Sequence, residues 1–137
     1  MARLSAHEAL IYLMVVTSAS DRDMTDVELA RIGDVVRTWP IFMDFEPERL
    51  LEVAQDCQKL VQEENGLEEV LWSARKAIPE HLHDTAYAAA FEVAAVDLEM
   101  RMEEFRVLQL LRKHLSVDPL TAAAIERANK ARQRSLT

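Results

Sequence analysis

The apolar residues of this chain recur mostly at helical spacing, and two of the apolar runs are nearly continuous. The first runs from Ala9 to Val16 and predicts a central, mostly buried helix over about 6–20. The second, over about 84–96, is mostly alanine with a few larger apolar residues, which lets neighbouring helices approach closely. It predicts a second central helix, and no strand is needed to account for the pattern.

Capping residues predict the ends of the helix that follows the first run. Thr25 and Glu28 have capping-box spacing, in which the hydroxyl and the carboxylate each accept a backbone N–H of the first turn. Pro40 disfavours a helical residue before it, so this helix should stop near Trp39. These signals predict a helix from about residue 25 to residue 39.

The middle of the chain predicts two further helices. Pro47 suits the first turn of one helix, and Asn65 with Gly66 supplies its stop. The other covers about 67–77, after which Pro79 starts a new element.

The C-terminal part predicts two more helices. One covers about 102–114 and is expected to turn Phe105, Leu108 and Leu111 inward. Asp118 and Pro119 are capping and first-turn signals for a last helix. Its apolar positions are Leu120, Ala123, Ala124 and Ala128.

One pattern occurs twice at the same internal spacing: Asp21, Met24 and Glu28, then Asp97, Met100 and Glu104. Asp23 in the first copy corresponds to Glu99 in the second, so each copy brings several carboxylates to one turn between apolar helices. The duplication predicts two helix-turn-helix units, over about 6–38 and 84–115. We expect a pseudo-twofold axis to relate them, with the two central helices packed together.

The composition fits this helical reading. A chain of 137 residues is long enough for one domain with its own core, and 2 Gly and 4 Pro leave few positions for tight β-turns. The sequence therefore predicts an all-α fold: a single domain over 1–137, a bundle of about seven helices built from two pseudo-repeated helix-turn-helix units.

Charge and cysteine content narrow the function. The net charge of −8 argues against nonspecific binding to nucleic acid or anionic lipid, and a cationic partner is easier to accommodate. Cys57 is the only cysteine, so no intramolecular disulfide is available. The N-terminal apolar run is too short for a membrane span and lacks the flanks of a signal peptide, so we expect a cytoplasmic protein without a transmembrane segment.

The acidic turns have two interpretations. In the first, their carboxylates only accept backbone N–H groups at helix starts, where the helix dipole favours negative charge. That interpretation does not explain why further acidic residues stand beside them. These residues are Asp23, Asp26, Glu99 and Glu103. In the second, a divalent cation or a basic partner offsets the repulsion among them. The candidate metal-binding residues are Asp21, Asp23, Glu28, Asp97, Glu99 and Glu104.

Other sites are less well supported by the sequence. The first turn is not an EF-hand, because Asp26 and Ile32 stand where that loop needs Gly and Glu. Glu80 and His83 have di-iron spacing but lack a second pair, and the histidine is expected at the surface. The serines, the cysteine and the histidines show no spacing that suggests a catalytic triad, and the sequence has no glycine-rich phosphate loop. We therefore expect no enzyme activity.

The repeated motifs resemble the TerB-like tellurite-resistance family over about 6–115. The matching residues are Ala19, Asp21, Met24, Glu28 and Ile32, then Ala94, Ala95, Asp97, Met100, Glu104 and Leu108. The stretch 91–97, FEVAAVD, looks especially like the second motif of that family. One departure is that Arg22 and Leu98 follow the aspartates, where the family usually has glycine.

The resemblance implies an all-α domain of about seven helices without enzyme activity, located in the cytoplasm or at the inner face of the membrane. It implies a role in tellurite resistance or a related stress response. A similar domain forms part of a membrane-tethered co-chaperone. It also implies that the acidic motifs bind metal through Asp21, Glu28, Asp97 and Glu104.

Two non-enzymatic functions are therefore open. One is a TerB-like module that binds a divalent cation or a basic partner at its acidic turns. The other is a metal-free interaction or co-chaperone-type scaffold that docks a partner helix through an apolar surface. The candidate surface comprises Trp39, Ile41, Phe42, Met43 and Phe45. Packing between helices in the core would explain these apolar residues equally well.

Overall fold

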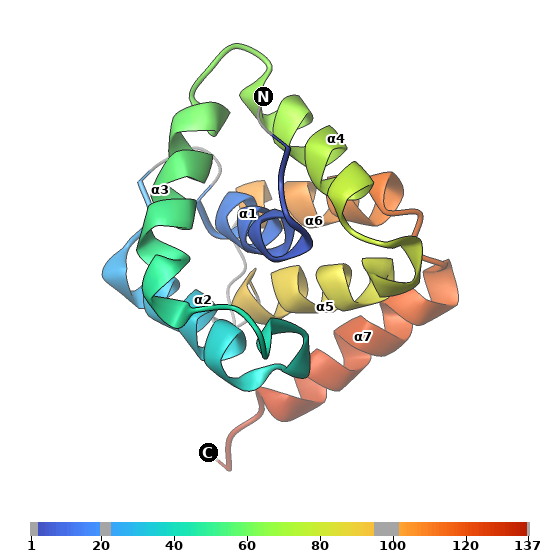
Figure 1. Ribbon diagram of the computed structural model, residues 1–137. Coiled ribbons are helices and arrows are strands. Elements are labelled where there is room, and N and C mark those ends of the chain that lie inside the picture. The colour runs from blue at the N-terminus through green and yellow to red at the C-terminus, as the bar shows by residue number, and fades with distance from the viewer. Residues whose placement is uncertain (1–2, 20–22, 95–101, 137) are drawn as a thin grey trace.

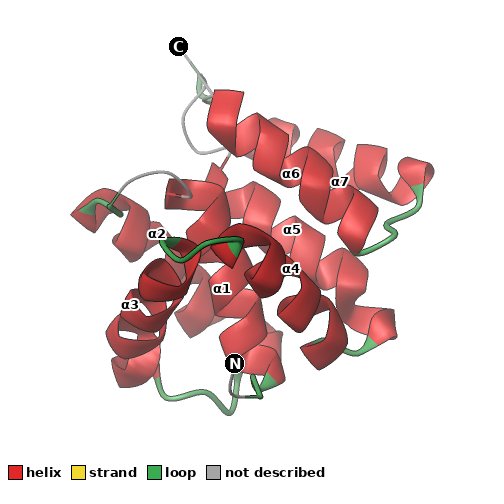
Figure 2. Cartoon of the chain, turned by 90° about the horizontal axis from the view of Figure 1, so that it is seen from above, coloured by secondary structure: helices red, strands yellow, loops and turns green. Residues whose placement is uncertain are grey.

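The structure is a computed structural model that describes residues 3–19, 23–94 and 102–136, apart from the side chains of 102–104. Within these ranges the chain is helical and has no strand, as Figure 2 shows. The α-helices there are α1 (Ala6–Ala19), α2 (Asp26–Thr38), α3 (Leu50–Val61), α4 (Gly66–Ala77), α5 (His83–Ala94), α6 (Met102–His114) and α7 (Pro119–Arg132). Short 3-10 helices are η1 (Pro40–Phe42), η2 (Pro47–Arg49) and η3 (Glu80–Leu82). The predicted all-α fold of about seven helices is confirmed.

α1 lies in the middle of the molecule, and the other helices surround it (Figure 1). It contacts five of them, α2 to α6. Every residue from Ala9 to Ala19 is buried, because the helix has no polar side that needs water. Its buried Thr17 hydroxyl donates a 2.7 Å hydrogen bond to the Leu13 carbonyl one turn earlier. The predicted central helix is confirmed.

α5 packs against α1, as the sequence predicted for the two central helices. Alanines at positions 86, 89 and 90 are buried in α5, and their small side chains allow the close approach. α2 and α3 lie on one side of this pair, and α6 and α7 lie on the other (Figures 1 and 2). The pseudo-twofold relation between the two units stays a prediction, because the second turn is outside the described residues.

The predicted capping signals of α2 and α7 are confirmed. Thr25 caps α2, and α2 ends at Thr38 just before Pro40, which begins η1. Asp118 caps α7 by accepting the N–H groups of Leu120 and Thr121 at 3.1 and 3.2 Å.

The role predicted for Asn65 and Gly66 was wrong. α3 ends earlier, at Val61, and Asn65 instead precedes α4 with a left-handed φ of 60°. Gly66 is the first residue of α4, and a Cβ there would lie 2.0 Å from the Leu60 carbonyl oxygen. Glycine is therefore required because the start of α4 approaches the end of α3 too closely for a side chain.

One predicted inward residue was wrong. On α6, Leu108 and Leu111 face inward as predicted, together with Val107, whereas Phe105 is 51% exposed. Leu120 is 79% exposed, so it is not part of the contact between α7 and the bundle.

Several polar side chains connect α7 to α5. The Glu92 carboxylate on α5 accepts hydrogen bonds from Asn129 at 3.1 Å, Arg132 at 3.0 Å and Gln133 at 3.2 Å. The Tyr87 hydroxyl of α5 donates a 2.6 Å bond to Glu126. These partners explain why a polar residue, Asn129, faces inward on α7.

Candidate functional site: the acidic turn before α2

The first acidic turn connects α1 to α2, and its described part begins at Asp23. Asp23 and Asp26 are exposed, and Glu28 is partly buried in the first turn of α2. Because α1 ends at Ala19 and α2 begins at Asp26, these carboxylates lie at a helix N-terminus. The positive end of the helix dipole favours negative charge there.

Thr25 and Glu28 form the predicted capping box. The Glu28 N–H donates to the Thr25 hydroxyl oxygen at 3.1 Å, and the Thr25 N–H donates to Glu28 Oε1 at 2.9 Å. The Thr25 hydroxyl also donates to Glu28 Oε1, at 3.1 Å. Glu28 therefore has a structural role in starting α2, as the capping interpretation predicted.

The six candidate metal ligands fall into two groups. Asp23 and Glu28 belong to the described turn that opens α2. Asp21, Asp97 and Glu99 lie outside the described residues, and Glu104 belongs to α6 with its side chain outside them. Within the part of the chain that the structure describes, no three His, Cys, Asp or Glu side chains are grouped to hold a metal ion.

Cys57 and Ser18, two side chains of the kind that can act as nucleophiles, are built into the core. Both side chains are buried, and burial raises the pKa of the Cys57 thiol well above its ordinary range. The Cys57 sulfur lies 3.7 Å from the Tyr12 carbonyl oxygen. Burial, together with the nearby Cys57 and Asp56, raises the pKa of the Tyr12 hydroxyl to about 12. These groups remain protonated and serve packing.

The apolar cluster around η1 is also core. Phe42 and Phe45 are 2% and 6% exposed, and the His7 ring packs on both, 5.5 and 5.6 Å away between centroids. His7 Nε2 lies 2.8 Å from the Ile41 carbonyl oxygen, which fixes the ring. Only Met43 of the candidate docking surface is largely exposed. Docking of a partner helix at this cluster was therefore a wrong prediction.

His83 is another residue whose predicted surface position was wrong. It is partly buried, and its two ring nitrogens lie 2.9 Å from the Ile78 carbonyl oxygen and 3.2 Å from the Leu115 carbonyl oxygen. These carbonyls follow α4 and α6, so His83 joins the ends of two helices.

A hollow of about 620 Å³ lies beside His83, between the end of α4 and the starts of α5 and α7. Its charged lining residues have both signs: Arg75, Lys76, Glu80, Asp84 and Asp118. Because the opposite charges offset one another, the lining offers no consistent electrostatic preference for a charged ligand.

A second capping box at the start of α1 was missed in the sequence. The Ser5 N–H donates to Glu8 Oε1 at 2.9 Å, and the Glu8 N–H donates to the Ser5 hydroxyl at 3.1 Å. Arg49 then bonds Glu8 Oε2 at 3.1 Å, which ties α1 to the start of α3. The signal was Ser5 followed three residues later by Glu8, the same spacing as in the Thr25 and Glu28 pair that identified α2.

No helix in the described residues is both long enough and apolar enough to cross a membrane. Comparison of the chain with protein-family models, with curated proteins and with solved structures found no match in any of the three. The TerB-like resemblance therefore stays a prediction that rests on the repeated residue pattern.

Proposed function

We propose that this chain is a non-enzymatic, TerB-like module of a tellurite-resistance or related stress response. In this proposal it binds a divalent cation or a basic partner at its acidic turns and works in the cytoplasm, free or at the inner face of the membrane. The observation that carries the proposal is the gathering of Asp23, Asp26 and Glu28 at the start of α2.

Electrostatics supports a cationic ligand at this turn. The helix dipole and the capping bonds stabilise one or two carboxylates at a helix start, but each additional carboxylate nearby is repelled by the others. A divalent cation offsets this repulsion, and carboxylate oxygens are the ligands that Ca²⁺ and Mg²⁺ prefer. A basic segment of a partner protein would act through the same attraction.

The positions of the reactive side chains support a non-enzymatic role. Cys57 is enclosed by the core and its raised thiol pKa keeps the nucleophilic thiolate from forming. Ser18 is buried, and His7 and His83 are engaged with backbone carbonyls.

Calorimetric titration of the EDTA-treated protein with Ca²⁺, Mg²⁺, Zn²⁺ and Mn²⁺ tests the cation version. We expect binding in the wild type and its loss in the double variant Asp21→Asn with Asp97→Asn. The matched control is Asp44→Asn with Glu46→Gln, which removes two negative charges from exposed positions elsewhere and should retain binding. Equal loss in both double variants would indicate a general charge effect and contradict a site at the turns.

The capping box favours a second candidate function. Because Glu28 already bonds Thr25 through both a backbone and a hydroxyl donor, the turn carboxylates are explained in part without a metal. The second candidate is a metal-free interaction or co-chaperone-type scaffold within a stress-response or membrane-associated complex. A folded wild-type protein that binds none of the four ions would favour it.

A further inference from the structure

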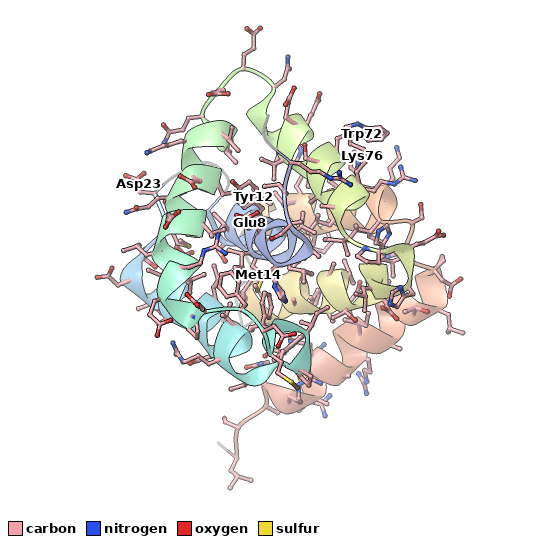
Figure 3. The ribbon with its side chains drawn as sticks, viewed as in Figure 1. Glu8, Tyr12, Met14, Asp23, Trp72 and Lys76 are labelled. Carbon is pink, nitrogen blue, oxygen red and sulfur yellow. The ribbon has the colours of Figure 1, made fainter. Side chains whose placement is uncertain are left out.

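The outward ridge of α4 carries an exposed tryptophan, with two acidic residues before it and two basic residues after it. Trp72 is 52% exposed, and it projects with Lys76 away from the body of the molecule (Figure 3). Glu68 and Glu69 lie in the first turn of α4, whereas Arg75 and Lys76 lie in the last. The helix buries its other side through Val70, Leu71 and Ala74.

The four charges are arranged symmetrically about the tryptophan. Glu68 and Lys76 are each four residues from Trp72, and Glu69 and Arg75 are each three residues from it. At a rise of about 1.5 Å per residue, the first pair lies about 6 Å and the second about 4.5 Å along the helix axis on either side of Trp72. A twofold axis through Trp72 therefore places every acid opposite a base.

The helix dipole accounts for only part of this arrangement. It favours acids in the first turn and bases in the last, but it does not favour a half-exposed indole between them. The cations also rest against the indole, with the Arg75 guanidinium carbon 5.8 Å and the Lys76 ammonium 5.7 Å from the ring centroid. They are therefore already oriented beside the tryptophan, where an approaching carboxylate would meet them.

The charge of the whole molecule makes this ridge a favourable place for two copies to meet. The chain has a net charge of −8, so most approaches of one copy to another are repulsive. The ridge carries two acids and two bases and is locally neutral. Tryptophan and arginine are also enriched among the residues that dominate binding at protein interfaces.

We propose that the protein self-associates through α4, as an antiparallel pair of α4 helices related by a twofold axis at Trp72. Such a contact is isologous, because the same patch is used by both copies and closes the assembly at a dimer. In it Glu68 and Glu69 of each copy pair with Lys76 and Arg75 of the other, and the two indoles pack at the axis. A single helix ridge is smaller than the standard interface of about 800 Å² per partner, so the dimer is weak and concentration-dependent.

Sedimentation velocity over about 10 μM to about 1 mM tests the dimer. We expect the wild type to pass from monomer to dimer, and Trp72→Ala to weaken association by at least about tenfold. Leu51→Ala is the matched control, because Leu51 on α3 is also 52% exposed, and it should associate like the wild type. A wild type that stays monomeric throughout, or a dimer unaffected by Trp72→Ala, would overturn the proposal.

Charge reversal tests the antiparallel register. Glu68→Lys alone should weaken association, and Glu68→Lys with Lys76→Glu in the same chain should restore it, because the two exchanged charges face each other only in the antiparallel arrangement. Thermal unfolding of each variant first establishes that it is folded, and if either is not, the Trp72→Ala and Leu51→Ala comparison decides. A folded double variant that fails to regain association would overturn the antiparallel register.

Discussion

α1 and α7 have the same length, 14 residues each, but they are held in the fold by different interactions. α1 buries a continuous run from Ala9 to Ala19 among five other helices. α7 fully buries only Ala122 and Asn129, and Glu92 and Tyr87 of α5 bond its polar side chains. The comparison shows that apolar burial maintains the centre of this molecule, whereas a few directional bonds determine how α7 is attached.

The two kinds of interaction should fail differently. Apolar burial around α1 involves many helices at once, so its loss lowers the stability of the whole domain. Hydrogen bonds to Glu92 involve only α5 and α7, so their loss should first allow α7 to separate.

The largest expected effect is a cavity in α1. Leu13 is 1% exposed, and Leu13→Ala should lower the free energy of unfolding by roughly 2–5 kcal/mol, because it removes apolar contacts and leaves a void. Urea denaturation measures this change. Leu120→Ala is the control, because Leu120 is 79% exposed and its loss should change stability by at most about 0.5 kcal/mol. Equal losses in the two variants would contradict the comparison.

A smaller effect is expected from breaking the attachment of α7. Glu92→Ala removes the acceptor of three hydrogen bonds and leaves the buried Asn129 amide without it, which should cost about 1–3 kcal/mol. Amide hydrogen exchange should then accelerate in α7 while α1 keeps its protection. Acceleration of the same size in both helices would show that α7 does not separate independently.

The smallest effect is expected at the start of α1, where a charged cap supplements apolar burial. The hydrogen bond from the Ser5 N–H lowers the pKa of Glu8 below its ordinary value of 4.5. The Ser5 hydroxyl and Arg49 make smaller contributions in the same direction, and burial opposes them. A carboxyl with a lowered folded-state pKa stabilises the fold above its ordinary pKa, and this contribution is lost as the pH falls through the folded value.

Glu8→Gln should therefore lower stability by roughly 0.5–1 kcal/mol at neutral pH. Denaturation at several pH values should show the wild type and the variant converging as the pH falls below 4.5. A constant difference down to strongly acid pH would mean that packing of the side chain, rather than its charge, is responsible.

The candidate site was only partly predictable from the sequence. The capping role of Glu28 followed from its spacing to Thr25, because a capping box is encoded within four consecutive residues. The outward ridge around Trp72 was not predicted, because helical periodicity identifies the buried side of α4 and says nothing about what its exposed side does. The capping box of Ser5 and Glu8 had a signal in the sequence that was not used.

Local features were determined by the sequence alone. α1 is buried because its apolar residues leave no polar side, and α2 and α7 begin at Thr25 and Asp118 because those side chains accept nearby backbone N–H groups. Each of these depends on residues within a few positions of one another, so no knowledge of the rest of the fold is needed.

Only the tertiary structure decided which side of an outer helix faces the bundle. Asn129 faces inward and Leu120 outward because Glu92, on a different helix, accepts the asparagine's hydrogen bond. Phe42 and Phe45 are core rather than a docking surface because His7, far away in the sequence, packs on both rings. These outcomes depend on partners brought together by folding, and spacing along the chain does not specify them.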